Sequence, residues 1–236
     1  MIAVPAQGRT FTSSRRARLA DLDSQGRVRL DAIARFLQDA AIDDVAETGW
    51  GVPEHLWFVR WFQVEIEEPF LADRELELVT WCSGLAAIAA GRRWSIRGDQ
   101  GGRAEVDSVW IHLDSTARPA RIEDFGAYAE ATAGRRVSTK LELPEPPDGA
   151  TRTAWQLRAS DLDLNGHVNN AVHWQAVEHL LGARGVDVRR PLRAYLAYGD
   201  PIDLEDTVEL ADWRDGETLE AAFVVGGRPR AYARVS

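Results

Sequence analysis

Cysteine is almost absent from this 236-residue chain, where Cys82 is the only one. A single cysteine excludes an internal disulfide and a cysteine-based metal site, which fits a reducing compartment such as the cytoplasm. Long apolar runs are also missing. The longest small and apolar stretch, residues 85–90, is far shorter than the roughly 20 residues that a membrane-spanning helix needs. We therefore expect a cytoplasmic protein without membrane insertion, with Cys82 buried in a strand.

An excess of positive charge is lacking as well. The chain has 37 Asp and Glu residues against 28 Lys and Arg residues, which gives a formal net charge of −9 at pH 7. Binding to nucleic acid needs a clustered basic surface, so an acidic average disfavours that function class. Hydrophobic residues make up 45% of the chain, which is ordinary for a soluble protein with a real core.

The sequence does contain an internal repeat. Residues 21–28 (DLDSQGRV) return as residues 161–168 (DLDLNGHV), with five identities in eight positions and an offset of 140. A second repeated triplet, Gly-Gly-Arg, stands later in each copy, in the same order. A segment with three prolines and no apolar periodicity lies between the copies and reads as a linker. We predict an N-terminal domain over residues 1–143, a linker over 144–150 and a C-terminal domain over 151–236.

Helical periodicity follows the repeated segment in both copies. Apolar positions within residues 33–45 precede Gly49 as a stop signal, and those within residues 171–181 precede Gly182. Residues 99–102 have the composition of a tight hairpin turn. The segments with strand-like alternation after the first helix are 57–66, 75–81, 92–97 and 104–113. Each copy therefore reads as α+β, with one long helix wrapped by an antiparallel sheet.

The second copy of the repeated segment carries side chains suited to hydrolysis. Asp163, Asn165 and His167 supply a carboxylate, an amide and an imidazole just before the predicted helix. We expect Asp163 to act as general base or nucleophile, Asn165 to orient water, and His167 to assist proton transfer. Backbone N–H groups in a first helical turn are unpaired and partly positive. Those of Val168 and Asn169 are therefore the predicted donors to an oxyanion.

A purely structural interpretation of the same segment is a helix cap, a turn at residues 165–166 and an exposed histidine. The first copy bears on this alternative, because it has Gln25 and Arg27 where the second has Asn165 and His167. A fold of this kind evidently manages without the amide and the imidazole. Their presence in the second copy favours a functional role there.

The unbroken motif Asp-x-Asn-x-His-Val-Asn-Asn at residues 163–170 resembles that of the acyl-ACP thioesterases of plants and bacteria. In that family the motif opens the helix of the second hotdog domain. First-half segments in the order expected for the family are 57–60, Glu67 and 80–84. The resemblance implies tandem hotdog domains of the α+β class, three catalytic motif side chains, and no metal or other cofactor. It also implies a fatty acyl group on acyl carrier protein (ACP) as substrate.

One position departs from the family pattern. The family usually places a glutamate on the strand after this helix, three residues beyond a tyrosine. Aligned on Tyr198, that site falls at Pro201. Asp200 and Asp203 flank the site, and either one supplies the missing carboxylate or is a turn residue. His173 stands where the family often has a tyrosine, and we expect it to pack within the helix interface.

The first domain is implied to bind the acyl chain rather than to catalyse. The helix face formed by Ile33, Leu37, Ala40 and Ala41 is apolar and includes two small residues, which makes it the candidate slot for the chain. Plain core packing is the alternative for this face. The two predictions differ in what a larger side chain would do there, because filling a slot shortens the substrate whereas overpacking a core destabilises the fold.

The sequence leaves open two alternatives for function, the identity of the carrier and the oligomeric state. A hotdog hydratase or dehydratase also combines these residue types, with a longer spacing than the one between Asp163 and His167. A noncatalytic acyl-thioester-binding protein belongs to a different class. The carrier is either ACP or CoA, and the protein is a monomer or a homodimer. Basic residues that are candidates for contacting an acidic carrier are Arg92, Arg93, Arg135, Arg136, Arg189, Arg190 and Arg193.

Overall fold

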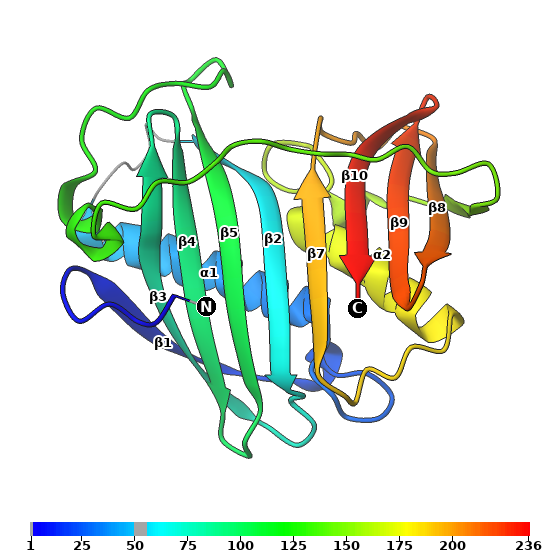
Figure 1. The fold of residues 1–236 in the computed structure, drawn as a ribbon, viewed down its shortest axis with the longest axis horizontal. Coiled ribbons are helices and arrows are strands. Elements are labelled where there is room, and N and C mark those ends of the chain that lie inside the picture. Colours follow the sequence, from blue (N-terminus) through cyan, green and yellow to red (C-terminus); the bar gives the residue numbers. More distant parts are fainter. Residues whose placement is uncertain (1, 50–55) are drawn as a thin grey trace.

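The computed structural model describes residues 2–49 and 56–236. Within them, ten strands form one antiparallel sheet, in the order β1-β3-β4-β5-β2-β7-β10-β9-β8-β6, and two long helices lie against one face (Figure 1). The helices are α1 (Leu30–Thr48) and α2 (Asn170–Ala183). The strands are β1 (Thr10–Arg16), β2 (Leu56–Glu68), β3 (Glu75–Ala86), β4 (Ala89–Gly98), β5 (Arg103–Leu113), β6 (Thr151–Trp155), β7 (Leu192–Tyr198), β8 (Val208–Asp215), β9 (Thr218–Val225) and β10 (Arg228–Val235).

The two halves of the sheet mirror each other. The order β1-β3-β4-β5-β2 in the first half corresponds, strand for strand, to β6-β8-β9-β10-β7 in the second. The halves join where β2 pairs with β7, from Trp61 opposite Ala197 to Ile66 opposite Leu192. Each half is a helix wrapped by its own part of the sheet. The predicted α+β class with tandem hotdog domains is therefore confirmed.

Each helix begins directly after a residue with extended backbone, and the two helices end differently at their C-termini. Gly49 ends α1 in the left-handed conformation, at φ 63°, as its position as a stop signal predicts. In α2 the predicted stop at Gly182 is wrong, because the helix continues to Ala183. Gly185 takes the left-handed conformation instead, at φ 65°, and donates its N–H to the carbonyl of Gly182.

The predicted strands 57–66, 75–81, 92–97 and 104–113 lie within β2, β3, β4 and β5. The sequence predicts strands only after the helix, whereas β1 and β6 precede the repeated segment of each copy. These are the two edge strands of the sheet. Their sequences, TFTSSRR and TRTAW, are mostly polar, and four of the five residues of β6 are exposed. Edge strands of this kind lack the apolar face by which strands are found in a sequence.

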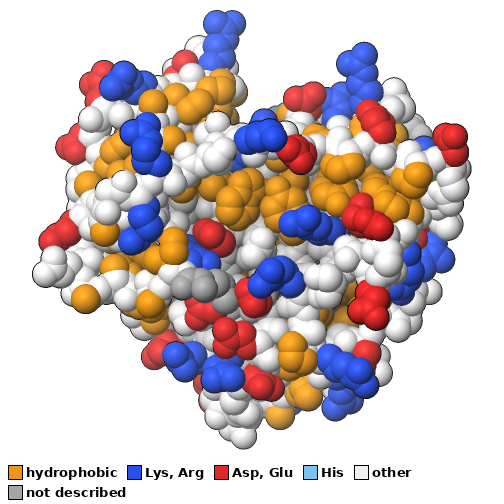
Figure 2. All heavy atoms as spheres, viewed as in Figure 1, with side chains coloured by type: hydrophobic (Ala, Val, Ile, Leu, Met, Phe, Trp, Pro, Cys, Tyr) orange, Lys and Arg blue, Asp and Glu red, His pale blue; other side chains and the backbone are white. Residues whose placement is uncertain are grey.

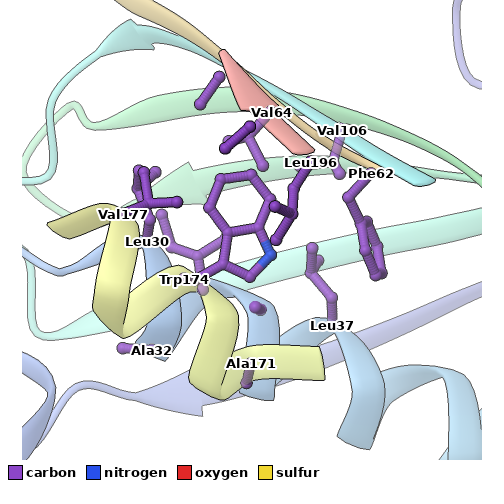
Figure 3. Packing of buried hydrophobic residues seen from close by; sticks show 14 of the residues in the cluster. Leu30, Ala32, Leu37, Phe62, Val64, Val106, Ala171, Trp174, Val177 and Leu196 are labelled. Atoms are coloured by element: carbon purple, nitrogen blue, oxygen red, sulfur yellow. The ribbon is translucent and has the colours of Figure 1, made fainter. Parts of the chain in front are cut away.

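Trp174 of α2 lies at the centre of a core that both halves share. Its side chain is 1% exposed and packs among Leu30 and Leu37 of α1, Phe62 and Val64 of β2, and residues of β7 (Figure 3). Burial of an aromatic ring of this size is among the largest single hydrophobic contributions to stability. The helices therefore hold the two halves together from one side, while the β2–β7 pairing holds them from the other.

Residues 114–150 connect the halves and cross the outer face of the sheet, opposite the helices (Figure 1). Two short 3-10 turns, at Gly126–Tyr128 and Glu130–Thr132, anchor this connection, with Tyr128 and Ala131 buried. Among the described helices, none is long and apolar enough to cross a membrane.

Candidate active site

The turn that carries the motif has the same backbone hydrogen bonds in both copies. Asp163 donates its N–H to the carbonyl of His167 over 2.8 Å, and Asp23 does so to Arg27 over the same distance. Asp163 Oδ1 also accepts the N–H groups of Asn165, at 2.8 Å, and His167, at 3.3 Å. Asp23 Oδ1 accepts the equivalent pair in the first copy. One carboxylate oxygen of Asp163 therefore shapes the turn, as the predicted bend requires.

His167 and Asp203 form a close pair. The distance from His167 Nδ1 to Asp203 Oδ1 is 2.7 Å, and the backbones of the two residues also pair as a β-bridge. Asp200 points elsewhere, since it accepts from Arg230 Nη1 at 2.8 Å and its side chain is 81% exposed. Of the two carboxylates flanking Pro201, Asp203 is thus the one that the structure places on the motif.

The predicted oxyanion donors are both engaged within the protein, and that prediction is wrong. Val168 donates its N–H to the carbonyl of Ile202 over 2.9 Å, and Asn169 donates to that of Asp161 over 2.8 Å. These bonds belong to the extended backbone that leads into α2, so the first helical turn starts one residue later than expected. Asn170 is the first residue of the helix, and no described residue accepts its N–H.

Two cavities meet at the motif. The larger has a volume of about 790 Å³ and the smaller one of about 70 Å³, and Trp57, Asp163, Asn165 and Asn170 line both. The smaller also contains His167. Other lining residues of the larger cavity come from α1, β3, β4 and the connection between the halves, among them Gln38, Ala41, Ile42, Val45, Ala46, Cys82, Leu85, Ala90, Arg92, Phe125 and Tyr128. The polar motif therefore opens onto a space large enough for an apolar chain.

The helix face predicted to form the acyl slot is mostly core. Ile33, Leu37 and Ala40 are at most 1% exposed, belong to the hydrophobic core and do not line the larger cavity. Ala41 does line it. The core residues face the sheet, whereas the cavity follows an adjacent face of the C-terminal half of α1. Helical periodicity identifies the buried stripe without separating it from the neighbouring stripe that borders a cavity.

Cys82 lines the larger cavity and is buried, as expected for a strand residue. Burial raises the pKa of its thiol to about 11, so the nucleophilic thiolate is scarce at neutral pH. Among residues 2–49 and 56–236, no group of three or more His, Cys, Asp or Glu side chains is arranged to hold a metal ion.

His173 is a packing residue, as predicted, and is 5% exposed. Its ring contacts the rings of Trp155, Tyr198 and Phe223, with centroids 5.0 to 5.7 Å away. Burial lowers its pKa from the usual 6.5 to about 4, although Nδ1 lies 3.2 Å from the carbonyl oxygen of Asn169. The imidazole is therefore neutral at pH 7, and the cluster contains no charge.

This shift predicts a stability loss in acid. Between pH 6.5 and 4 the unfolded chain binds a proton at His173 that the folded protein does not, so its contribution to stability falls with falling pH. We expect this group to lower the free energy of unfolding by about 3 kcal/mol from pH 7 to 4. Urea unfolding of wild type and His173→Phe at both pH values measures the effect. An equally steep pH dependence in the variant would contradict it.

The first copy fills the position that corresponds to the motif with its own charges. Arg27, which replaces His167, donates from Nε to Asp23 at 3.0 Å and from Nη1 to Glu178 of α2 at 3.1 Å. Glu178 Oε1 also accepts the N–H of Leu30, the first residue of α1, at 2.6 Å. The side chain of Arg27 is 5% exposed. This arrangement closes the first helix N-terminus, whereas the second opens onto the cavities.

Comparison with known proteins identifies the family. The acyl-ACP thioesterase N-terminal domain matches residues 8–126, and the C-terminal domain of the same family matches residues 145–225. The chain belongs to the acyl-ACP thioesterase family. It is accordingly a thioester hydrolase of fatty acyl thioesters, which sets aside the dehydratase and noncatalytic alternatives.

Several proteins similar to this thioesterase align with nearly the whole length of its chain. The uncharacterized protein Rv2001 of Mycobacterium tuberculosis is 26% identical, over 99% of this chain and 94% of its own. An acyl-ACP thioesterase from Bacteroides thetaiotaomicron has a TM-score of 0.77 at 16% identity, over 96% of each chain. A 12:0-ACP thioesterase from Umbellularia californica has a TM-score of 0.76 at 17% identity, again over 96% of each chain. The structures share the fold of this chain.

Proposed function

We propose that this thioesterase cleaves fatty acyl-ACP with its thioester carbonyl at the junction of the two cavities and its acyl chain in the larger one. The observation that carries the proposal is the position of Asp163 and Asn165, which line both spaces. A polar hollow of about 70 Å³ holds the histidine, and an adjoining space of about 790 Å³ has mostly apolar walls. Ligand sites commonly combine such an apolar space with a few convergent polar groups.

The chemistry we propose is hydrolysis assisted by the three motif side chains. Asp163 removes a proton from a water molecule as the water oxygen attacks the carbonyl carbon, and Asn165 orients that water. The C–S bond then breaks, and the proton that Asp163 took from water passes through Nε2 of His167 to the departing sulfur, which leaves as a thiol. Asp203 holds Nδ1 of His167, which leaves Nε2 for this transfer. A thiol with a pKa near 8.5 is a good leaving group, so the attack on the carbonyl needs most assistance.

We propose that ACP is the carrier of the substrate and that the thioesterase acts in fatty acid synthesis in the cytoplasm. Two of the basic candidates for this contact are internal: Arg92 donates to Asp44 at 2.6 Å, and Arg93 is 4% exposed. On the face in Figure 2, basic and acidic side chains alternate without a large basic patch. The exposed candidates are Arg136, Arg189, Arg190 and Arg193. We also propose that residues 1–143 form the chain-binding domain and 151–236 the catalytic one.

A panel of substrates tests this function. Purified protein is incubated with acyl-ACP and acyl-CoA of graded chain length, and the free thiol is measured with a thiol reagent. We expect release of thiol from acyl-ACP, with a preferred range of chain lengths. Binding without release of thiol from any member of the panel would contradict the proposed function.

Two adjacent alanines separate chain binding from core packing. We expect Ala41→Phe to shorten the preferred acyl chain, because Ala41 lines the larger cavity. Ala40 is 0% exposed within the core, so Ala40→Phe should instead lower the free energy of unfolding by about 1 to 3 kcal/mol. Chain-length profiles and melting temperatures of both variants are the measurements. An unchanged profile in a stable Ala41→Phe protein would place the acyl chain elsewhere.

A further inference from the structure

The two helices contact each other in an antiparallel manner, and the contact is not symmetric in chemistry. Glu178 of α2 reaches the N-terminus of α1, where its Oε1 accepts the N–H of Leu30 at 2.6 Å. The internal offset of 140 residues relates Leu30 to Asn170 and Glu178 to Gln38. The residue of α1 that corresponds to Glu178 is therefore a neutral glutamine.

Gln38 is half-buried and lines the larger cavity together with Asn165, Asn169 and Asn170, which agrees with this relation. No described residue accepts the N–H of Asn170, whereas the equivalent N–H of Leu30 is bound by a carboxylate. The first copy thus shows a negatively charged oxygen held at a helix N-terminus. In the second copy the corresponding residue, Asn170, lines the cavity.

We propose that the side-chain amide of Gln38 and the backbone N–H of Asn170 together bind the oxygen of the thioester carbonyl as it becomes negatively charged. The carboxylate of Glu178 occupies this position in the first copy, beside Arg27. A glutamate at position 38 would accept the Asn170 N–H and repel the oxyanion, whereas a glutamine donates a hydrogen bond to it. This inference rests on the proposed function and makes Gln38 a catalytic residue supplied by the first domain.

Kinetics of three glutamine variants test the inference on acyl-ACP. We expect Gln38→Leu to lower kcat by roughly 10²- to 10³-fold with little change in KM, because it removes one oxyanion donor. Gln38→Glu, which nearly preserves the shape, should lower kcat at least as much. Gln25→Leu is the matched control. Gln25 is exposed and takes the place of Asn165 in the first copy, so wild-type kcat is expected.

A binding measurement separates catalysis from simple contact with the chain. A thioether analogue of the substrate has the same acyl chain without a carbonyl oxygen, and we expect it to bind Gln38→Leu and wild type equally. Wild-type kcat in Gln38→Leu would overturn the inference, as would a loss of analogue affinity equal to the loss of kcat/KM. Failure of the proposed function itself would look different, because wild type would then release no thiol or His167→Ala would keep full activity.

Discussion

Replacement of Arg27 by alanine is expected to lower the free energy of unfolding by about 3 to 5 kcal/mol, because it breaks a buried ion pair on one side only. The guanidinium of Arg27 is 5% exposed and lies between Asp23 and Glu178, whose side chains are 20% and 11% exposed. Its loss removes both hydrogen bonds from Arg27 to Glu178 and leaves the N–H of Leu30 as the remaining hydrogen-bond donor to this carboxylate among the described residues. Such a loss is a large part of the 5 to 15 kcal/mol, roughly, that stabilises a typical protein.

The same variant should keep its turnover per folded molecule, because Arg27 belongs to the copy without the motif. Urea unfolding and kcat, corrected for the folded fraction, are measured together. Arg16→Ala is the control for removal of an arginine ion pair, since Arg16 is 60% exposed beside Glu75 and should contribute at most about 1 kcal/mol. A fall in corrected kcat as large as that in His167→Ala would show that the first helix N-terminus takes part in catalysis.

The repeat of residues 21–28 at 161–168 was sufficient to predict the two-domain organisation. Each copy contains a turn and the start of a helix, and an apolar stripe follows on that helix. Local signals were enough to predict these elements, namely a glycine in each turn and helical periodicity after it. Both glycines, Gly26 and Gly166, have a positive φ in the structure. The edge strands β1 and β6 were missed because their residues are mostly polar on both faces. Their existence depends on hydrogen bonds to β3 and β8, which are distant in the sequence.

Prediction of the site was limited by the same dependence on distant partners. The motif itself was visible, but its spacing gave no means of choosing between Asp200 and Asp203, because the choice depends on where the chain returns after β7. The N–H groups of Val168 and Asn169 were assigned to an oxyanion from the general rule for helix N-termini. The carbonyls of Asp161 and Ile202 that occupy them became visible only in the folded chain.

Asp163→Asn is expected to lower kcat on acyl-ACP by roughly 10²- to 10⁴-fold, the usual contribution of acid–base catalysis. The amide oxygen of asparagine can still accept the N–H groups of Asn165 and His167, so the turn should remain intact while the proton acceptor is lost. His167→Ala should fall within the same range. Steady-state kinetics and melting temperatures of both variants are the measurements.

Asp23→Asn is the matched control, because Asp23 makes the same turn in the first copy. It should cost stability, since Asp23 also accepts from Arg27, and leave kcat unchanged. Two further variants test the Asp203 carboxylate that contacts His167. Asp203→Asn should reduce kcat with little effect on KM, whereas Asp200→Asn should leave kcat unchanged. If Asp163→Asn folds and keeps near wild-type turnover, the Asp163 carboxylate serves the turn alone and a different group must activate the water.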